Sequence, residues 1–160
     1  MHLAMMEASG GEAAMRVDGA CHCGNVKYEA DVNPSHVVIC HCTDCQALSG
    51  TAFRVVVATS AGSFRLIQGE LKIYTKIGES GNPREQTFCG NCGSPIYSAP
   101  PGPQPKVVSL RIGTIRQRAK LIPSHQYWHR SSFPWLPSLP DIDKTVTQPV
   151  FDERGGFVPD

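Results

Sequence analysis

The residues with the clearest chemical signature in this sequence are its seven cysteines. They form two pairs and one triple along the chain: Cys21 and Cys23; Cys40, Cys42 and Cys45; and Cys89 and Cys92. An odd number of cysteines does not complete a set of disulfide bonds, and closely spaced cysteines without a secretory signal are typical of metal binding or catalysis. The spacing therefore favours a metal-binding protein over a disulfide-stabilised one.

Thiolates bind zinc at tetrahedral angles, and structural zinc sites have four protein ligands whereas catalytic sites have three and keep one position open. Seven thiols divide as four and three. Because the triple is compact enough to hold one ion alone, the two pairs are left to complete the other site. We therefore expect two zinc ions with these ligands: Cys21, Cys23, Cys89 and Cys92 at a structural site, and Cys40, Cys42 and Cys45 at a second, open site.

Alternatives to this division start from the same residues. One cysteine of the first pair can join the triple, which leaves a poor second site. A redox role for a C-x-x-C motif needs a surrounding βαβ pattern, which neither motif has. Iron also binds in cysteine-rich sites, although an open three-cysteine site favours zinc. His22 and His41 alternate with the ligands, so their side chains are expected to point away from the metals.

The three-cysteine site predicts a particular kind of chemistry. Three thiolates leave a bound zinc ion with a net negative formal charge, which makes it a weak Lewis acid and a poor generator of hydroxide. An incoming thiol is still deprotonated on coordination, and its thiolate can attack an electrophilic carbon. The site therefore favours the formation or cleavage of a carbon–sulfur bond over hydrolysis, with a thiol in the open position.

Residues that follow the triple closely are expected to lie beside the second zinc and to bind substrate: Ser49, Gly50, Thr51 and Phe53. The two hydroxyls can donate hydrogen bonds to a ligand, and the phenyl ring can form a wall of the pocket. The alternative is that this segment is only a helix C-cap followed by a core strand. No catalytic residue is identified beyond the metal ligands.

Short segments rich in β-branched and aromatic residues predict a mainly β domain that positions these cysteines. Gly and Pro-rich turns separate the expected strands: Val26–Ala30, His36–Ile39, Phe53–Ala58, Phe64–Ile67, Leu71–Thr75, Gln86–Phe88, Ile96–Ser98 and Val107–Ile112. A short helical turn is expected after a cap at Thr43 or Asp44 and before Gly50, which brings Cys42 and Cys45 onto one face.

Length, charge and hydropathy narrow the class of protein. The 160 residues suggest one domain over residues 16–140, with a disordered leader at 1–15 and a C-terminal tail at 141–160. No apolar run approaches the roughly 18 residues of a membrane helix, and cysteine use predicts the reducing cytoplasm. The net charge of +1 excludes a general polyanion binder, although residues 86–140 carry six Lys and Arg and no Asp or Glu.

Three segments of the chain resemble the glutathione-dependent formaldehyde-activating enzyme family, also called the centromere protein V-like family: Cys21–Val26, Cys40–Cys45 with Ser49–Phe53, and Phe88–Tyr97. The similarity runs from about Val17 to Pro140, and Gly113-Thr114 and Pro134-Trp135 look like its later motifs. Three cysteine groups in this order make the resemblance specific.

The resemblance implies a fold of packed β-sheets of the Mss4 type, with zinc-stapled hairpins and at most short helices. It also implies the division into a four-cysteine and a three-cysteine zinc site. The expected activity is that of a carbon–sulfur lyase, which joins glutathione and formaldehyde in S-hydroxymethylglutathione. The alternative is a non-catalytic zinc-binding module or glutathione carrier that contacts a partner through its basic C-terminal half. Nucleic acid is not expected as a partner, since no basic tail with interleaved aromatic residues is present.

Overall fold

The computed structural model describes residues 13–158 and confirms the mainly β fold class. Nine strands and one short α-helix form the domain, and four 3-10 turns follow in the C-terminal third. The strands are β1 (Met15–Ala20), β2 (Lys27–Cys40), β3 (Arg54–Thr59), β4 (Arg65–Gln68), β5 (Leu71–Ile77), β6 (Pro83–Cys89), β7 (Pro95–Ala99), β8 (Ser109–Arg111) and β9 (His125–Tyr127). The leader predicted for residues 1–15 lies almost wholly outside the described residues, so the domain division stays a prediction.

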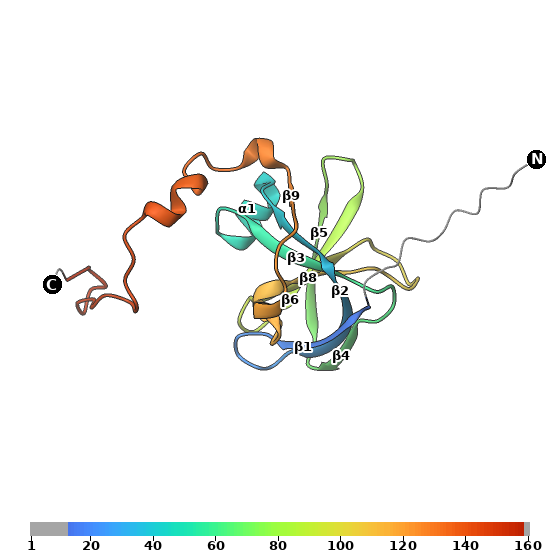
Figure 1. Ribbon diagram of the computed structural model, residues 1–160. Coiled ribbons are helices and arrows are strands. Elements are labelled where there is room, and N and C mark those ends of the chain that lie inside the picture. Colours follow the sequence, from blue (N-terminus) through green and yellow to red (C-terminus); the bar gives the residue numbers. More distant parts are fainter. Residues whose placement is uncertain (1–12, 159–160) are drawn as a thin grey trace, which may run out of the picture.

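One hydrogen-bonded sheet contains all nine strands, in the order β1-β2-β3-β8-β7-β6-β5, with β4 and β9 paired to β2 off this path. All pairs are antiparallel except β2 with β9, which is parallel. The sheet is twisted, so that β1 and β4 lie at the bottom of Figure 1 and the β5–β6 hairpin rises at the top.

The long strand β2 organises the sheet because its two halves have different neighbours. Its first half pairs with β1 and β4, and its second half pairs with β3 and β9. The register shifts between Val32 and Val37, at the Asn33-Pro34 turn predicted to separate two strands. A bulge absorbs the proline, which has no N–H to give to a ladder, so the strand bends there and continues.

The two faces of the central strands differ in chemistry. On one face, Val37 pairs with Val57 and Val57 with Leu110, and all three are fully buried in the hydrophobic core. Residues one position along point to the opposite face, because side chains alternate along a strand. There Cys40 lies opposite Arg54, and Val56 lies opposite Arg111. The sheet therefore carries an apolar core on one side and a polar, cysteine-bearing face on the other.

The core is anchored by Tyr28, whose buried hydroxyl lies 2.8 Å from the hydroxyl of Thr114. Burial raises the pKa of Tyr28 to about 12, because ionisation in this environment is unfavourable. Gly19 passes so close to the ring that an added Cβ would lie 2.3 Å from the Tyr28 hydroxyl oxygen. Only glycine fits at this position of β1.

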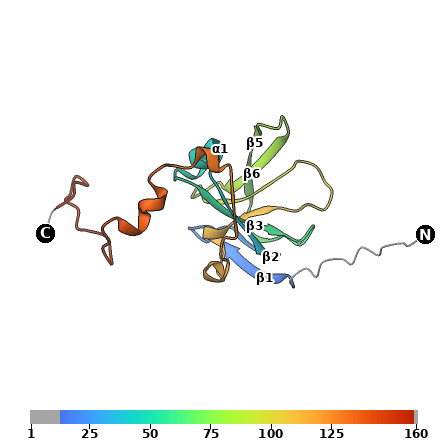
Figure 2. The same ribbon diagram turned by 45° about the horizontal axis from the view of Figure 1, so that its top comes forward.

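The helical elements connect strands or follow the last strand of the chain. They are α1 (Thr43–Ser49), η1 (Ile112–Thr114), η2 (Arg118–Lys120), η3 (His129–Ser131) and η4 (Leu136–Asp141). In Figure 1 and Figure 2, α1 lies beside β9 and η3, and the chain from η4 onward extends away from the sheet. Within residues 13–158 no helix is long and apolar enough to cross a membrane.

Candidate metal centre

The structure brings the two outer cysteine pairs together although 66 residues separate Cys23 from Cys89. Cys21 and Cys23 lie in the turn after β1, and Cys89 and Cys92 lie at the turn between β6 and β7. The four sulfur atoms lie within 4.8 Å of one another, with Sγ–Sγ distances of 3.6 Å for Cys21–Cys23 and 3.9 Å for Cys23–Cys89. A tetrahedron with Zn–S bonds of about 2.3 Å has S–S edges of about 3.8 Å. This four-cysteine cluster therefore fits a zinc ion.

Polar neighbours of the four-cysteine cluster favour thiolates. The Asn91 side-chain amide donates to Cys23 Sγ at 3.3 Å, and this bond lowers the pKa of Cys23. The Ser94 hydroxyl lies 3.2 Å from Cys92 Sγ and lowers the pKa of that thiol to about 5. Metal ligands must be deprotonated, and hydrogen bonds from outer groups hold them in place. The donors around this cluster are thus suited to metal binding.

Glycine conformation shapes both turns of the four-cysteine cluster. Gly24 and Gly93 follow the second cysteine of each pair and have φ angles of 78° and 74°. Their amides donate to the carbonyls of Cys21 and Cys89 at 3.1 and 2.9 Å, which closes each turn. A side chain would strain these left-handed conformations.

The second cluster is built where β2 ends and α1 begins. Cys40 is the last residue of β2, Cys42 is the N-cap of α1, and Cys45 lies in the first turn of α1. Their three sulfur atoms lie within 4.8 Å of one another. The predicted cap at Thr43 or Asp44 is wrong, because the Cys42 sulfur itself accepts the amide hydrogen of Cys45 at 3.3 Å. The capping interaction thereby orients a metal-binding group.

The thiols of this three-cysteine cluster oppose one another's ionisation. The Cys45 thiol donates to Cys40, which lowers the pKa of Cys40 to about 5 and raises the pKa of Cys45 well above its usual range. Burial also raises the pKa of Cys45. A bound divalent cation would allow all three to ionise together. The donor set therefore fits zinc, with three protein ligands rather than four.

Two buried arginines lie on the same sheet face as the three-cysteine cluster, and the sequence reasoning missed them. Arg54 is the cross-strand partner of Cys40 in the β2–β3 ladder. Arg111 lies on the next strand, β8, opposite Val56 of β3. Arg111 donates to Gln86 Oε1 at 2.7 Å, and Arg54 approaches the same oxygen at 3.4 Å. Burial lowers the pKa of Arg111 to about 9, because the low dielectric disfavours its charge. Such a buried cationic pair is costly unless anionic groups lie beside it.

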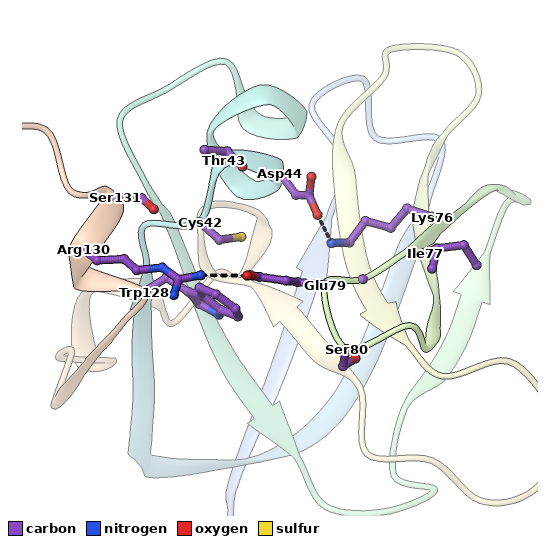
Figure 3. A pocket seen from close by; sticks show the side chains of 11 residues that line it. Cys42, Thr43, Asp44, Lys76, Ile77, Glu79, Ser80, Trp128, Arg130 and Ser131 are labelled. Carbon is purple, nitrogen blue, oxygen red and sulfur yellow. Dashed lines mark hydrogen bonds and ion pairs between the residues drawn. The ribbon is translucent and has the colours of Figure 1, made fainter.

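A pocket of about 620 Å³ opens beside Cys42 (Figure 3). The sulfur of Cys42 points into it, between α1 on one side and the tip of the β5–β6 hairpin on the other. Two ion pairs span the pocket, between Lys76 and Asp44 and between Arg130 and Glu79, the second at 2.7 Å. The volume falls in the range of ligand-binding pockets. Both signs of charge are therefore presented within reach of the cluster.

Trp128 forms part of this pocket wall and is held in an unusual conformation. Its φ angle is 57°, the only positive φ of a non-glycine residue among those described. The guanidinium of Arg130 lies 4.8 Å from the centre of its ring, a cation–π contact. Its side chain lines the pocket, and the residue is 41% exposed. Its strained backbone holds the indole against the opening.

The residues predicted to bind substrate lie at the far end of α1. Gly50 is the left-handed C-cap of the helix, with φ 66°. The Ser49 hydroxyl donates to the carbonyl of Cys45 at 2.6 Å, and the Thr51 hydroxyl donates to the carbonyl of Phe53 at 2.6 Å. None of these four lines the pocket beside Cys42. Their hydrogen bonds are local, and their substrate-binding role stays a prediction.

The histidines of the candidate site are not metal ligands within residues 13–158, where the two cysteine clusters are the only groups able to hold a metal. His41 is buried, and its Nε2 lies 2.7 Å from Gln126 Oε1. Its ring packs edge-on against Phe53 and His129. His41 therefore packs between β9, η3 and the residue that precedes β3.

Residues 16–131 match the model of a protein family described as glutathione-dependent formaldehyde-activating enzyme. This chain belongs to that family. The matched region contains all seven cysteines and ends at the last residue of η3. Membership links the chain to glutathione and to formaldehyde activation, and the two cysteine clusters are able to hold metal ions.

A crystal structure of a Rhodobacter sphaeroides protein is similar in fold, with a TM-score of 0.53 and 17% sequence identity. The similarity covers 68% of this chain and 98% of that one. At this level of identity the likeness concerns the fold alone. The comparison with curated proteins gives no match.

Proposed function

We propose that this protein is a zinc-dependent carbon–sulfur lyase that forms or cleaves the adduct of glutathione, or a similar thiol, with a small aldehyde such as formaldehyde. The observation that carries the proposal is the three-thiol cluster with Cys42 facing the 620 Å³ pocket. Three protein donors beside a pocket are typical of catalytic metal sites, whereas four are typical of structural ones. Family membership supports glutathione and formaldehyde as the reactants.

Cys40, Cys42 and Cys45 would hold the catalytic zinc, and the four-cysteine cluster would hold the structural one. When bound, the catalytic ion would supply an open position that lowers the pKa of a substrate thiol. The protein itself supplies the orientation of these ligands through the strand end and the helix cap. The free thiols that these sites need persist in a reducing compartment, so we also propose a cytoplasmic location.

The pocket charges suit a zwitterionic peptide thiol. Lys76 and Arg130 are positioned for carboxylates, and Asp44 and Glu79 for an ammonium group. Each charge is satisfied by its partner across the pocket, so a ligand replaces existing ion pairs rather than filling an apolar space. Such exchange costs little at the Arg130–Glu79 pair, whose side chains are 69% and 64% exposed, because exposed ion pairs are weak. The pocket thus favours glutathione over an uncharged thiol of the same size.

The basic C-terminal half gives less support to a partner-binding module. Lys106 pairs with Glu85, Arg116 with Asp18 and Arg130 with Glu79. Arg111 is buried. Most of the positive charge of this segment is therefore neutralised or inaccessible, which leaves little for nucleic acid or an acidic protein.

The exchange of formaldehyde between its free and glutathione-bound forms, followed by NMR, tests the proposal. The wild-type protein is expected to accelerate the exchange above the spontaneous rate. Cys42→Ala is expected to fold normally and to return the rate to the spontaneous one. A wild-type protein without acceleration, or a Cys42→Ala protein that keeps it, would contradict the proposed activity.

A further inference from the structure

The arginine pair behind the three-cysteine cluster has no carboxylate partner. Arg54 and Arg111 are only 5% and 7% exposed, and the ion pairs within residues 13–158 include neither of them. Nε of Arg111 is buried without any hydrogen-bond partner. A buried charge is normally paired and fully hydrogen-bonded, since its desolvation is costly. These residues therefore require an anionic group that the protein chain provides only in part.

The neighbouring thiolates account for some of that charge. Arg54 is directly opposite Cys40 in the β2–β3 ladder, where facing Cβ atoms lie about 5 Å apart. Three thiolates with a divalent cation keep one net negative charge, whereas the two arginines carry two positive charges. One positive charge stays unmatched, and Arg84, half-buried with its guanidinium near that of Arg111, adds another. The site is therefore suited to an additional anion.

A second cavity connects the cysteine cluster with this positive charge. It has a volume of about 200 Å³ and is lined by Cys40 and Arg111, by Ser98, Ser109 and Tyr127, and by the apolar strand residues Val38 and Val56. Cys42 lines the larger pocket and Cys40 lines this one, so the cluster has a cavity on each side. The volume is below that of ordinary ligand pockets and admits a molecule of a few heavy atoms. A peptide thiol needs the volume of the larger pocket, and the small cavity has room for the carbonyl substrate.

We propose that the cavity between Cys40 and Arg111 is a carboxylate subsite, so that the aldehyde used at the three-cysteine site is glyoxylate, the 2-oxo acid whose carbonyl is an aldehyde. This inference rests on the proposed function and names its substrate class. The Arg111 guanidinium binds the carboxylate, as the planar fork of arginine binds carboxylates in two parallel hydrogen bonds. Because carboxyl and carbonyl carbons are directly bonded in such an acid, the anchored carboxylate holds the reacting carbon near the cluster.

The reaction is an addition that needs no oxidant or reductant. The sulfur lone pair of the thiol forms a bond to the aldehyde carbon, and the C=O π electrons move to the oxygen. The thiol proton ends on that oxygen, which gives a hydroxy thioether carboxylate. The carboxylate itself is unchanged, so Arg111 contributes to binding and orientation throughout.

Rate enhancement over the spontaneous reaction, measured by NMR exchange with glutathione as the thiol, tests this subsite. Wild-type protein is expected to enhance adduct formation from glyoxylate about 10- to 100-fold more than from acetaldehyde, which has no carboxylate. Arg111→Gln and Arg111→Lys are expected to reduce this preference. Because the preference is a ratio within one preparation, partial unfolding does not change it. Arg116→Gln, an exposed arginine elsewhere, is expected to keep the wild-type ratio.

Binding gives a readout that is independent of turnover. Titration calorimetry of the metal-loaded protein with glyoxylate, without thiol, is expected to show saturable binding that Arg111→Gln weakens about 10- to 100-fold. Substitution of N-acetylcysteamine, which has neither a carboxylate nor a free amine, for glutathione tests the other source of a carboxylate. An Arg111 effect that persists with N-acetylcysteamine supports the aldehyde as its source, and an effect that vanishes overturns the assignment.

The failures of the two proposals are distinguishable. A protein that accelerates no aldehyde, with or without a carboxylate, refutes the proposed lyase activity. A protein that accelerates formaldehyde and acetaldehyde but shows no preference for glyoxylate retains that activity and overturns the carboxylate subsite. An Arg111→Gln protein that loses all three aldehydes equally also overturns the subsite, because its arginine would then serve only to balance the thiolates.

Discussion

The four-cysteine cluster and the three-cysteine cluster use the same ligand in different surroundings. The first joins two β-turns, and its polar neighbours are Asn91 and Ser94 from the same turn as Cys92. The second lies at a strand end and a helix cap, between two cavities and beside buried arginines. The comparison indicates that one cluster closes the sheet between distant hairpins, whereas the other is open to ligands on two sides.

The difference has a topological cause. Cys21 and Cys23 lie in the turn between β1 and β2, and Cys89 is the last residue of β6. In the sheet, three strands separate β2 from β6. A metal there links parts of the sheet that backbone hydrogen bonds do not connect. The three other cysteines lie within six consecutive residues, so a metal there links only neighbouring parts of the chain. Loss of the first metal is therefore expected to affect folding, and loss of the second to affect chemistry.

The largest expected effect is that of Cys89→Ala on folding. A structural zinc ion contributes roughly 10–16 kcal/mol of apparent binding free energy, which is comparable with the roughly 5–15 kcal/mol stability of a whole domain. We expect this variant to lose its cooperative thermal transition, as measured by circular dichroism. A Cys89→Ala protein that melts like wild type would contradict the structural role of the four-cysteine cluster.

The next effect separates the clusters by metal content. Cys42→Ala is expected to retain a cooperative transition and one of the two zinc ions, as counted by elemental analysis of the purified protein. The reason is that the three-cysteine site is built from neighbouring residues, so the loss of its metal leaves the pairing of the strands intact. Retention of both ions, or loss of the fold, would show that the two clusters are not separable in this way.

A smaller effect is expected from the neighbours of the ligands. The Ser94 hydroxyl accepts the amide hydrogen of His22 at 3.0 Å and lies against Cys92 Sγ. Ser94→Ala is expected to weaken the structural zinc about 10- to 100-fold in competition with a chelator, since outer hydrogen bonds tune metal ligands. Ser63→Ala, which removes a hydroxyl bound only to backbone carbonyls and an amide elsewhere, serves as the control. Equal zinc affinity in the two variants would argue against this role of Ser94.

The smallest effect concerns the large pocket at the open cluster. Lys76→Ala removes the ion pair with Asp44 and is expected to raise the KM for glutathione about two- to fivefold, with little change in kcat. Stability is expected to change by less than about 1 kcal/mol, because surface ion pairs are weak. Arg16→Ala, which breaks an exposed pair with Glu29, is the matched control. A KM unchanged by Lys76→Ala would place the thiol outside this pocket.

Local patterns were sufficient for much of the fold and for the grouping of the cysteines. Segments rich in β-branched residues predicted the positions of β3 and β5. The strands β1 and β9 were missed: β9 has only three residues, and both strands are defined by pairing with β2. The strand β2 continues past Asn33-Pro34 because both of its halves pair with neighbouring strands, whereas local turn propensity alone predicts a break there.

The arginines and the pocket could not be predicted from the sequence for a different reason. Arg54 and Arg111 are 57 positions apart and meet only because β3 and β8 are neighbours in the sheet. Arginine is ordinarily exposed, so nothing in its local sequence indicates burial. The one available signal is that Arg54 begins a valine-rich strand directly after the Ser49–Phe53 motif. The pocket likewise depends on the β5–β6 hairpin tip, whose approach to α1 is a long-range contact.

The open coordination position of the three-cysteine cluster is tested most directly by zinc X-ray absorption on the metal-loaded protein, with and without glutathione. Seven sulfur ligands are expected to be shared by the two zinc ions before the thiol is added. The account predicts that glutathione raises the total to eight, with a new Zn–S bond of about 2.3 Å. An unchanged sulfur coordination number at saturating glutathione would contradict it.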